Sequence, residues 1–472
     1  MPLKFVKSNK GKNQLIADGE LYYKHGEGSN GKVIWRCVQY KTGCRGICHT
    51  SSVLRDGIIL HQTEHTTHAP NAAAVETKRV VAKLRKKAVT SKEASSSLVA
   101  SVLGTVSSPV AAQLPSAESL SRTVRGIRQR NNPLPPNPRK STLYEIPEHF
   151  QQTLKSVKFL LFDSEDINNR LLIFATEDNL QVLRGCDTWY CDGTFKVVPE
   201  IFDQLYTVHG EVNGKVVPLV YALCPNRRKR TYQTLLRVLK DAIPGVAPKN
   251  VMSDFEMAFL KAVTLEFPEC ELKGCLFHFG QALWRSIQDH DLAPLYRESS
   301  RVARNLRMLF ALAFVPFCDV HYAYDALLQS KFFTDNEKDL RGFLDYFEHT
   351  WVGVLGRRKV RRGAMFDVSL WNHYSSVMVA VARTNNAVEG WHHALNRRAN
   401  GSHLVLWKMI ELLQAEQGLV EAHIARANAH APANNRNKRY KDNDARLKSL
   451  VAAYNRQDVL QYLKNVAANL SL

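Results

Sequence analysis

The segment TWYCDGTF, residues 188–195, indicates the fold expected for the larger part of the chain. Its first half has the aromatic and apolar residues of a buried strand, and an Asp-Gly pair then interrupts them. Two more strand-like segments follow at 205–212 and 215–223. The dipeptide Asn213-Gly214 between them is the strongest short signal for a β-hairpin. The sequence therefore predicts three consecutive antiparallel strands.

Beyond the hairpin, the pattern alternates between helix and strand. Helices are expected at about 231–242 and 255–265, one strand ends at Asp254, and another covers about 271–277. Three antiparallel strands followed by alternating helices and strands is the order of an RNase H-like sheet. From about 280 to 380, apolar residues recur at helical spacing, which predicts a helical insertion.

The net charge favours a nucleic-acid partner. Lys plus Arg is 64 and Asp plus Glu is 44, which leaves a formal charge of +20. Each phosphate that a basic side chain neutralises releases condensed counterions, so this excess suits a polyanion. The alternative is that the charge serves solubility alone, but acidic residues would do that equally well.

The cysteines and the apolar segments indicate the cellular compartment. Nine cysteines are odd in number and thinly spread, which is typical of a reducing compartment with one metal site rather than a disulfide framework. The first residues, MPLKFVK, lack the apolar core of a signal peptide, and the longest apolar run, 308–317, is too short to span a bilayer. We therefore expect an intracellular chain without a membrane segment. Basic clusters at 83–87 and 227–230 would serve nuclear import, phosphate contacts or a solvated face.

Two cysteines and two histidines near the N-terminus form a candidate zinc site. They are Cys37, Cys44, His65 and His68. Two thiolates and two imidazoles suit a tetrahedral Zn²⁺ ion. A domain this small and this poor in large apolar groups gains much from such a staple. The alternative interpretation is that the cysteines are small buried hydrophobes.

The surroundings of these four residues resemble a FLYWCH zinc finger. The residues that carry the resemblance are Phe5, Leu15, Tyr22 or Tyr23, Trp35, Cys37 and Cys44, in that order. The family closes with His-x-His, whereas this chain has His65-Thr-Thr-His68, which leaves His61 as an alternative third ligand. The resemblance implies one structural Zn²⁺ and a module that binds DNA.

Three acidic residues stand at the ends of predicted elements. Asp192 and Asp254 each follow an apolar strand, and Glu389 lies where Asn385 or Asn386 would cap a helix. Converging carboxylates repel one another unless hard cations neutralise them, and two Mg²⁺ ions would also drive in-line phosphoryl displacement. Taken singly, each acid has a structural explanation as a turn residue, a helix cap or a partner of the helix dipole.

Together these segments resemble the Mutator-like (MULE) transposases. The matching elements are CDGTF at 191–195, DFE at 254–256, Cys-x-x-His at 275–278 and TNNAVEGWH at 384–392. The resemblance implies that Asp192, Asp254 and Glu389 are catalytic acids that bind two Mg²⁺ or Mn²⁺ ions. Cys275 and His278 would either bind a metal or brace the strand-to-helix corner, and bracing is favoured because only two soft ligands are in view.

The sequence thus predicts a Mg²⁺-dependent DDE-type DNA transposase of the nucleus. It would bind terminal inverted repeats with residues 1–130, assemble as a homo-oligomer on DNA, and cut and join strands at target DNA. The first alternative is a domesticated relative that regulates transcription by binding DNA without transposition. A second alternative is that the FLYWCH module binds a protein.

The expected fold class is α+β multidomain: a small β-rich zinc finger, then an RNase H-like α/β core with a large helical insertion. The expected parts are a zinc finger (1–70), a basic, partly helical linker region (71–140), the first part of the core (141–280), the helical insertion (281–380), the completion of the core with the third acid (381–415) and a C-terminal helical region (416–472). The proline-rich segment 131–138 is the expected extended linker.

Overall fold

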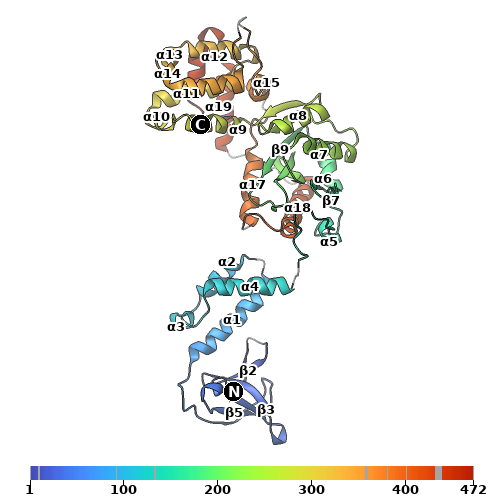
Figure 1. Ribbon diagram of the computed structural model, residues 1–472, viewed down its shortest axis with the longest axis vertical. Helices are drawn as coiled ribbons and strands as arrows, with labels where there is room; N and C mark the ends of the chain where they lie inside the picture. The colour runs from blue at the N-terminus through green and yellow to red at the C-terminus, as the bar shows by residue number, and fades with distance from the viewer. Residues whose placement is uncertain are drawn as a thin grey trace. The chain divides into compact units, whose positions relative to one another are not determined.

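The chain divides into two compact units, Met1–Pro136 and Asn137–Leu472 (Figure 1). The structure is a computed structural model that describes residues 2–8, 11–91, 93–131, 134–356, 360–379, 381–399, 401–430 and 438–470. Within these ranges, every helix is too short or too polar to cross a membrane.

The first unit begins with a six-stranded sheet in which each strand pairs antiparallel with the next. Its strands are β1 (Lys4–Lys7), β2 (Asn13–Ala17), β3 (Glu20–Glu27), β4 (Val33–Cys37), β5 (Ile47–Thr50) and β6 (Ile59–Gln62). Side chains alternate along β4, so that Val33, Trp35 and Cys37 all point into the core. The Trp35 indole N–H donates to Thr50 Oγ1 at 2.8 Å, which satisfies its one polar group.

Four helices complete the first unit: α1 (Ala72–Thr90), α2 (Ser95–Leu103), α3 (Ser108–Ala111) and α4 (Ala117–Asn131). The Asn71 side chain caps α1 by accepting from the Ala74 N–H. The helices share an apolar core of their own, with Leu84, Val99 and Val124 among its members. The expectation that residues 71–140 are partly helical is confirmed by these four helices.

The second unit contains a seven-stranded sheet in the order β13-β12-β9-β10-β11-β8-β7. Its strands are β7 (Leu160–Asp163), β8 (Leu172–Phe174), β9 (Thr188–Thr194), β10 (Gln204–Val212), β11 (Lys215–Cys224), β12 (Asn250–Ser253) and β13 (Glu271–Gly274). β12 runs parallel to β9 and to β13, and the other pairs are antiparallel. Asn213 and Gly214 both have positive φ, 49° and 75°, as a two-residue hairpin turn requires.

Helices cover this sheet and supply the crossovers that its parallel strands need. α7 (Lys229–Ala242) leads into β12, and α8 (Met257–Glu266) leads into β13. α6 (Glu177–Arg184), α7, α8 and α18 (Leu406–Asn428) all contribute buried side chains to one apolar core with the strands. Residues 160–184, which hold β7, β8 and α6, were not predicted as part of the sheet.

A second apolar core lies among the helices that follow β13. These helices are α9 (Leu276–Asp289), α10 (Ala293–Glu298), α11 (Ser300–Ala311), α12 (Val320–Leu328), α13 (Lys331–Asp335), α14 (Glu337–Phe347), α15 (Val368–Trp371) and α16 (Tyr374–Met378). α19 (Lys438–Ala452) and α20 (Val459–Ala467) pack back onto α16 and onto α11 and α12, respectively. α19 and α20 therefore belong to the helical part. α18 packs with the sheet instead, and it crosses the boundary expected at residue 415.

Candidate functional site

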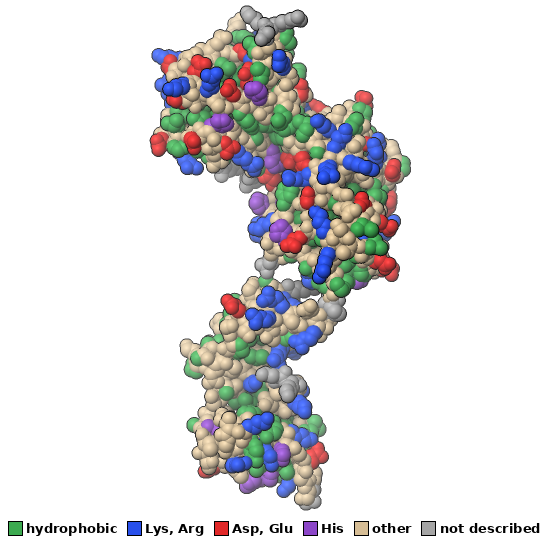
Figure 2. Space-filling model, in the orientation of Figure 1, with side chains coloured by type: hydrophobic (Ala, Val, Ile, Leu, Met, Phe, Trp, Pro, Cys, Tyr) green, Lys and Arg blue, Asp and Glu red, His purple; other side chains and the backbone are tan. Residues whose placement is uncertain are grey.

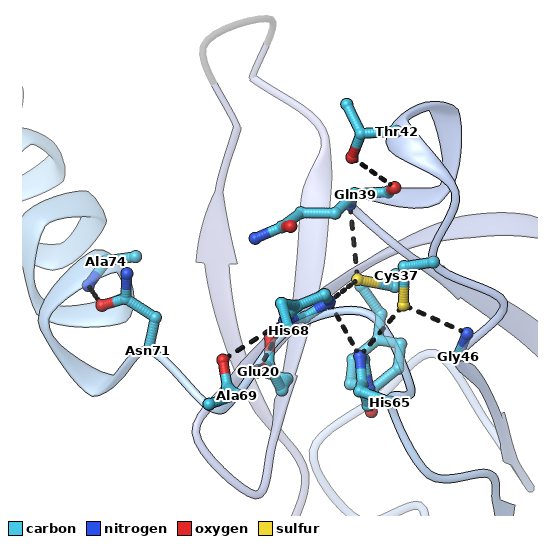
Figure 3. Close-up of polar contacts among 12 residues, drawn as sticks. Glu20, Cys37, Gln39, Thr42, Gly46, His65, His68, Ala69, Asn71 and Ala74 are labelled. Atoms are coloured by element: carbon cyan, nitrogen blue, oxygen red, sulfur yellow. Dashed lines mark hydrogen bonds and ion pairs between the residues drawn. The ribbon is translucent and has the colours of Figure 1, made fainter.

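Four potential zinc ligands meet in the first unit (Figure 3). Cys37 Sγ lies 3.3 Å from His68 Nε2, Cys44 Sγ lies 3.3 Å from His65 Nδ1, and the two imidazole nitrogens are 3.1 Å apart. Tetrahedral Zn²⁺, with bonds of about 2.3 Å to sulfur and about 2.0–2.1 Å to nitrogen, places its ligand atoms roughly 3.3–3.8 Å from one another. The donor set and its spacing therefore fit a structural zinc ion.

Backbone geometry around the two cysteines supports the same assignment. The Gln39 N–H donates to Cys37 Sγ and the Gly46 N–H donates to Cys44 Sγ, both at 3.3 Å (Figure 3). Such bonds stabilise sulfur in its thiolate form, which is the form that binds metal. A Cβ atom at Gly46 would lie 2.6 Å from the His65 ring, so the turn after Cys44 needs a glycine.

The outer nitrogen of each histidine also has a partner, and sequence reasoning missed both partners as functional residues. His68 Nδ1 lies 3.3 Å from a carboxylate oxygen of Glu20, whose residue is only 5% exposed. His65 Nε2 lies 2.7 Å from the Tyr22 hydroxyl. Partners of this kind fix the orientation of metal-binding imidazoles. His61, the alternative third ligand, lies against His49 instead, with ring centroids 5.5 Å apart.

Replacement of Glu20 should weaken zinc binding without abolishing it. Glu20→Gln removes the negative charge beside His68, and loss of such a partner lowers metal affinity by about 10- to 100-fold. Competition with a colorimetric chelator measures the change. The matched control is Glu27→Gln on the same strand, where the carboxylate is exposed and pairs with Lys24. Equal zinc affinity in both variants would contradict the role given to Glu20.

In the second unit, Asp192 and Asp254 occupy equivalent positions along the neighbouring parallel strands β9 and β12. Tyr190 of β9 pairs with Met252 of β12, and each acid comes two residues later. Side chains two residues apart point to the same face of a strand, so the two carboxylates share one face. β9 does not end before Asp192 as expected, because Thr207 of β10 pairs with Asp192 and extends the strand.

Glu389 reaches this edge of the sheet in the first turn of α17 (Asn386–Ala399). Asn385, the residue before the helix, is wholly buried and fixes its start. The Asn385 amide group donates to the Cys191 carbonyl at 3.0 Å, and its backbone N–H donates to Cys275 Sγ at 3.2 Å. The side chain of Asn385 thus ties α17 to β9 next to Asp192, and it does not form the helix cap that the sequence suggests.

Two histidines lie beside two of the three acids. His392 Nδ1 lies 3.4 Å from Asp192 Oδ2, and His278 Nε2 lies 3.5 Å from Glu389 Oε1. His392 follows Glu389 by about one helical turn, so both face the sheet edge from α17. Sequence reasoning did not assign His392, although it stands within the quoted motif.

Cys275 and His278 lie at the junction of the sheet and the helical part. Their ligand atoms and one oxygen of Glu389 all lie within 4.8 Å of one another, a spacing that a metal ion could bridge. Cys275 also braces the corner, because its N–H donates to the Ser253 carbonyl at 2.7 Å while its sulfur accepts from Asn385. Both interpretations made from the sequence therefore have a geometric basis.

The acids influence one another electrostatically. Burial, with the negative charges of Asp192 and Glu256, raises the pKa of Asp254 to about 7. Burial and the charge of Asp192 raise the pKa of Glu389 to about 7. Asp192 is thus close enough to affect both other acids. Glu256, which accepts from the Tyr232 hydroxyl at 2.7 Å, is a fourth acid of the cluster that sequence reasoning did not assign.

Comparison with known protein families gives two matches. Residues 188–282 match the MULE transposase domain, and residues 5–68 match the FLYWCH zinc finger domain. The first match includes Asp192 and Asp254 but ends before Glu389, whereas the second includes all four zinc-cluster residues. Among curated proteins, none matches the sequence.

Proposed function

We propose that this chain, which carries a FLYWCH zinc finger ahead of a MULE transposase domain, is a metal-dependent DNA transposase that cuts and joins DNA strands. The observation that carries the proposal is the arrival of three acids from distant parts of the chain at one edge of the sheet. Asp192 affects the pKa of both Asp254 and Glu389, and His392 and His278 contact the first and the third acid.

We assign the sheet to the RNase H-like class, and the strand order supports this. In β11-β10-β9-β12-β13 the first three strands are antiparallel and the last two run parallel to β9, which is the arrangement expected from the sequence. The core would consist of residues 141–280 and 381–415, with 281–380 as its insertion. We add α18 to the core because Gln417 in it hydrogen-bonds the buried Asn179 of α6.

The donor set of the acidic site suits Mg²⁺ or Mn²⁺. Carboxylate oxygens are the ligands that these hard cations prefer. One oxygen of Glu389 is buried without a hydrogen-bond partner among the described residues, and burial, together with the charge of Asp192, raises the pKa of both Asp254 and Glu389. When bound, two ions would activate the attacking oxygen and stabilise the leaving one. Asn385 would hold α17 against the sheet, and His392 would hold the Asp192 carboxylate in position for that chemistry.

We propose that the first unit recognises DNA and that the positive charge of the chain contributes to binding. The zinc finger would bind the terminal inverted repeats of the element, and the acidic site would act on the repeat ends and on target DNA. We further propose that the protein works in the nucleus as a homo-oligomer on DNA. The formal charge of +20 supports a polyanionic partner.

A domesticated DNA-binding regulator is the second candidate. It would retain the fold and lose transposition, but the presence of Asp192, Asp254 and Glu389 favours the enzyme. Incubation of the purified chain and Mg²⁺ with duplexes that carry the inverted repeats flanking its gene separates the two. Cleavage at the repeat ends supports the transposase, whereas binding without cleavage under Mg²⁺ and Mn²⁺ supports the regulator.

The metal proposal predicts a pH-dependent stabilisation by Mg²⁺ or Mn²⁺. The folded-state pKa values of Asp254 and Glu389 lie above their ordinary values, so protonation stabilises the metal-free fold. This contribution is complete below about pH 4 and is lost as the pH rises through about 7. A cation competes with the protons, and it should therefore raise the melting temperature more at about pH 8 than at about pH 6.

Differential scanning fluorimetry with and without a chelator measures this effect. Glu389→Gln should reduce the shift caused by the metal, while Glu421→Gln, which alters a carboxylate paired with Lys155 away from the acidic cluster, should retain it. An equal metal-induced shift at both pH values would contradict binding at the raised-pKa acids.

A further inference from the structure

The helical module α1–α4 is a second structured part of the first unit, beside the zinc finger, and neither family match covers it. It has its own apolar core, so its exposed side chains are held on a defined scaffold. Its composition is strongly basic. The basic residues are Lys78, Arg79, Lys83, Arg85, Lys86, Lys87, Lys92, Arg122, Arg125, Arg128 and Arg130, and the acids are Glu76, Glu93 and Glu118.

α4 separates its side chains into two opposite faces. Leu120 and Val124 are buried against the other helices, and α4 contacts both α1 and α2. Arg122, Arg125 and Gln129 are exposed, at spacings of three and four residues that align them along one side of the helix. In Figure 2, Lys and Arg side chains gather over this helical part with little acidic surface between them.

Two exposed arginines of α4, Arg122 and Arg125, can bind a partner. Among the residues that the structure describes, none forms an ion pair or a hydrogen bond with the side chain of Arg122 or Arg125. Arg128 differs, because its guanidinium donates to the Ala88 and Ser91 carbonyls at 3.2 and 2.7 Å and so joins α4 to the end of α1. One arginine of α4 thus fixes the helix, while two others remain available.

We propose that α4 enters the major groove of duplex DNA and that Arg122, Arg125 and Gln129 contact base edges. An α-helix with its side chains is about 10–12 Å wide, which matches the about 12 Å width of the major groove. Arginine pairs with guanine through two hydrogen bonds, and glutamine pairs with adenine in the same way. In three-helix DNA-binding domains, the last helix occupies the groove while the others support it.

The chemistry of this face favours DNA over a protein partner. The outward side of α4 offers Arg122, Arg125 and Gln129, with the acid Glu118 confined to its first turn, and lacks the large apolar anchors that form the centre of a stable protein interface. The exposed side of α1 adds Lys83, Lys86 and Lys87, which suit phosphate contacts on the flank of the groove. The inference rests on the proposed function and deepens it, since it names α4 as a second element that recognises the same DNA.

Methylation interference on the full-length protein tests the inference, with binding sites selected from a random-sequence duplex pool as the probe. Methylation of guanine N7 blocks contacts in the major groove. Arg122→Ala and Arg125→Ala should each remove interference at particular guanines and weaken binding by about tenfold. Interference that arises from the zinc finger should remain. Circular dichroism and thermal unfolding should match those of the unaltered protein, because both side chains are exposed.

The control is the double variant Lys338→Ala/Arg341→Ala on α14, which removes two exposed charges at the same spacing as Arg122 and Arg125, more than either single variant, and should leave the interference pattern intact. An unchanged pattern and affinity in the Arg122 and Arg125 variants would overturn the inference, whether or not a protein is later found on this face. Failure of the unaltered protein to bind any duplex would instead overturn the proposed function.

Discussion

Asp192→Asn should abolish Mg²⁺-dependent strand cleavage while duplex binding survives. The substitution keeps the shape of the side chain and removes the charge that acts on both Asp254 and Glu389. Without that charge, the site would no longer hold two divalent ions, and removal of one such preorganised group slows a reaction by a factor on the order of 10³. Gel assays of nicked and joined products on the element's own repeat ends measure the loss.

The matched control is Asp187→Asn, just before the same strand. Asp187 is exposed and pairs with Lys249 at the surface, so this variant should cut DNA at the ordinary rate. Binding should be equal in the two variants, which excludes misfolding as the cause. Cleavage by Asp192→Asn at the rate of the control would end the catalytic assignment of the acidic site.

Cys37→Ser should unfold the zinc finger and leave the second unit folded. Metal binding in small zinc domains contributes an apparent folding free energy of about 10–16 kcal/mol, which far exceeds what a small apolar core supplies. The buried core around Trp35 is of that kind. Elemental analysis should find one Zn²⁺ per chain in the unaltered protein and a reduced amount in the variant. Limited proteolysis should cut the variant within residues 2–70.

Cys48→Ala provides the control for this experiment. Cys48 is as buried as Cys37 in the same sheet but does not belong to the ligand cluster. Its replacement should retain zinc and lower stability only by the amount expected for a small cavity. Full DNA affinity in a metal-free preparation would contradict the structural role of zinc.

Local signals in the sequence predicted much of the framework. The Asn213-Gly214 dipeptide requires two residues with positive φ, and the hairpin of β10 and β11 has them. The apolar residues at 188–191 begin β9, and the crossover helices α7 and α8 lie where apolar periodicity placed them. The four residues predicted as zinc ligands also meet, and the sequence signals for them were their type and the FLYWCH pattern around them.

Features that depend on contacts between distant residues could not be predicted from these local signals. β7 and β8 are short, and they join the sheet only because β8 pairs with β11 and β7 pairs with β8. Asn385 or Asn386 was expected to cap the helix that follows, but the side chain of Asn385 contacts Cys191 across the fold. Glu20 looks like an ordinary strand residue until the chain brings His68 beside it. Periodicity and propensity do not encode these partners.

The two hydrogen bonds of Asn385 also determine how late in synthesis the acidic site can be completed. Its partners Cys191 and Cys275 precede it by 194 and 110 residues, with the whole helical insertion between them. Closure over such separations is slow compared with local folding. A nascent chain therefore exposes Asp192 and Asp254 on the ribosome well before Glu389 is synthesised. Under the proposed function, a product that ends within the insertion would keep the zinc finger, lack the third acid, and compete with the complete protein for DNA ends without cutting them.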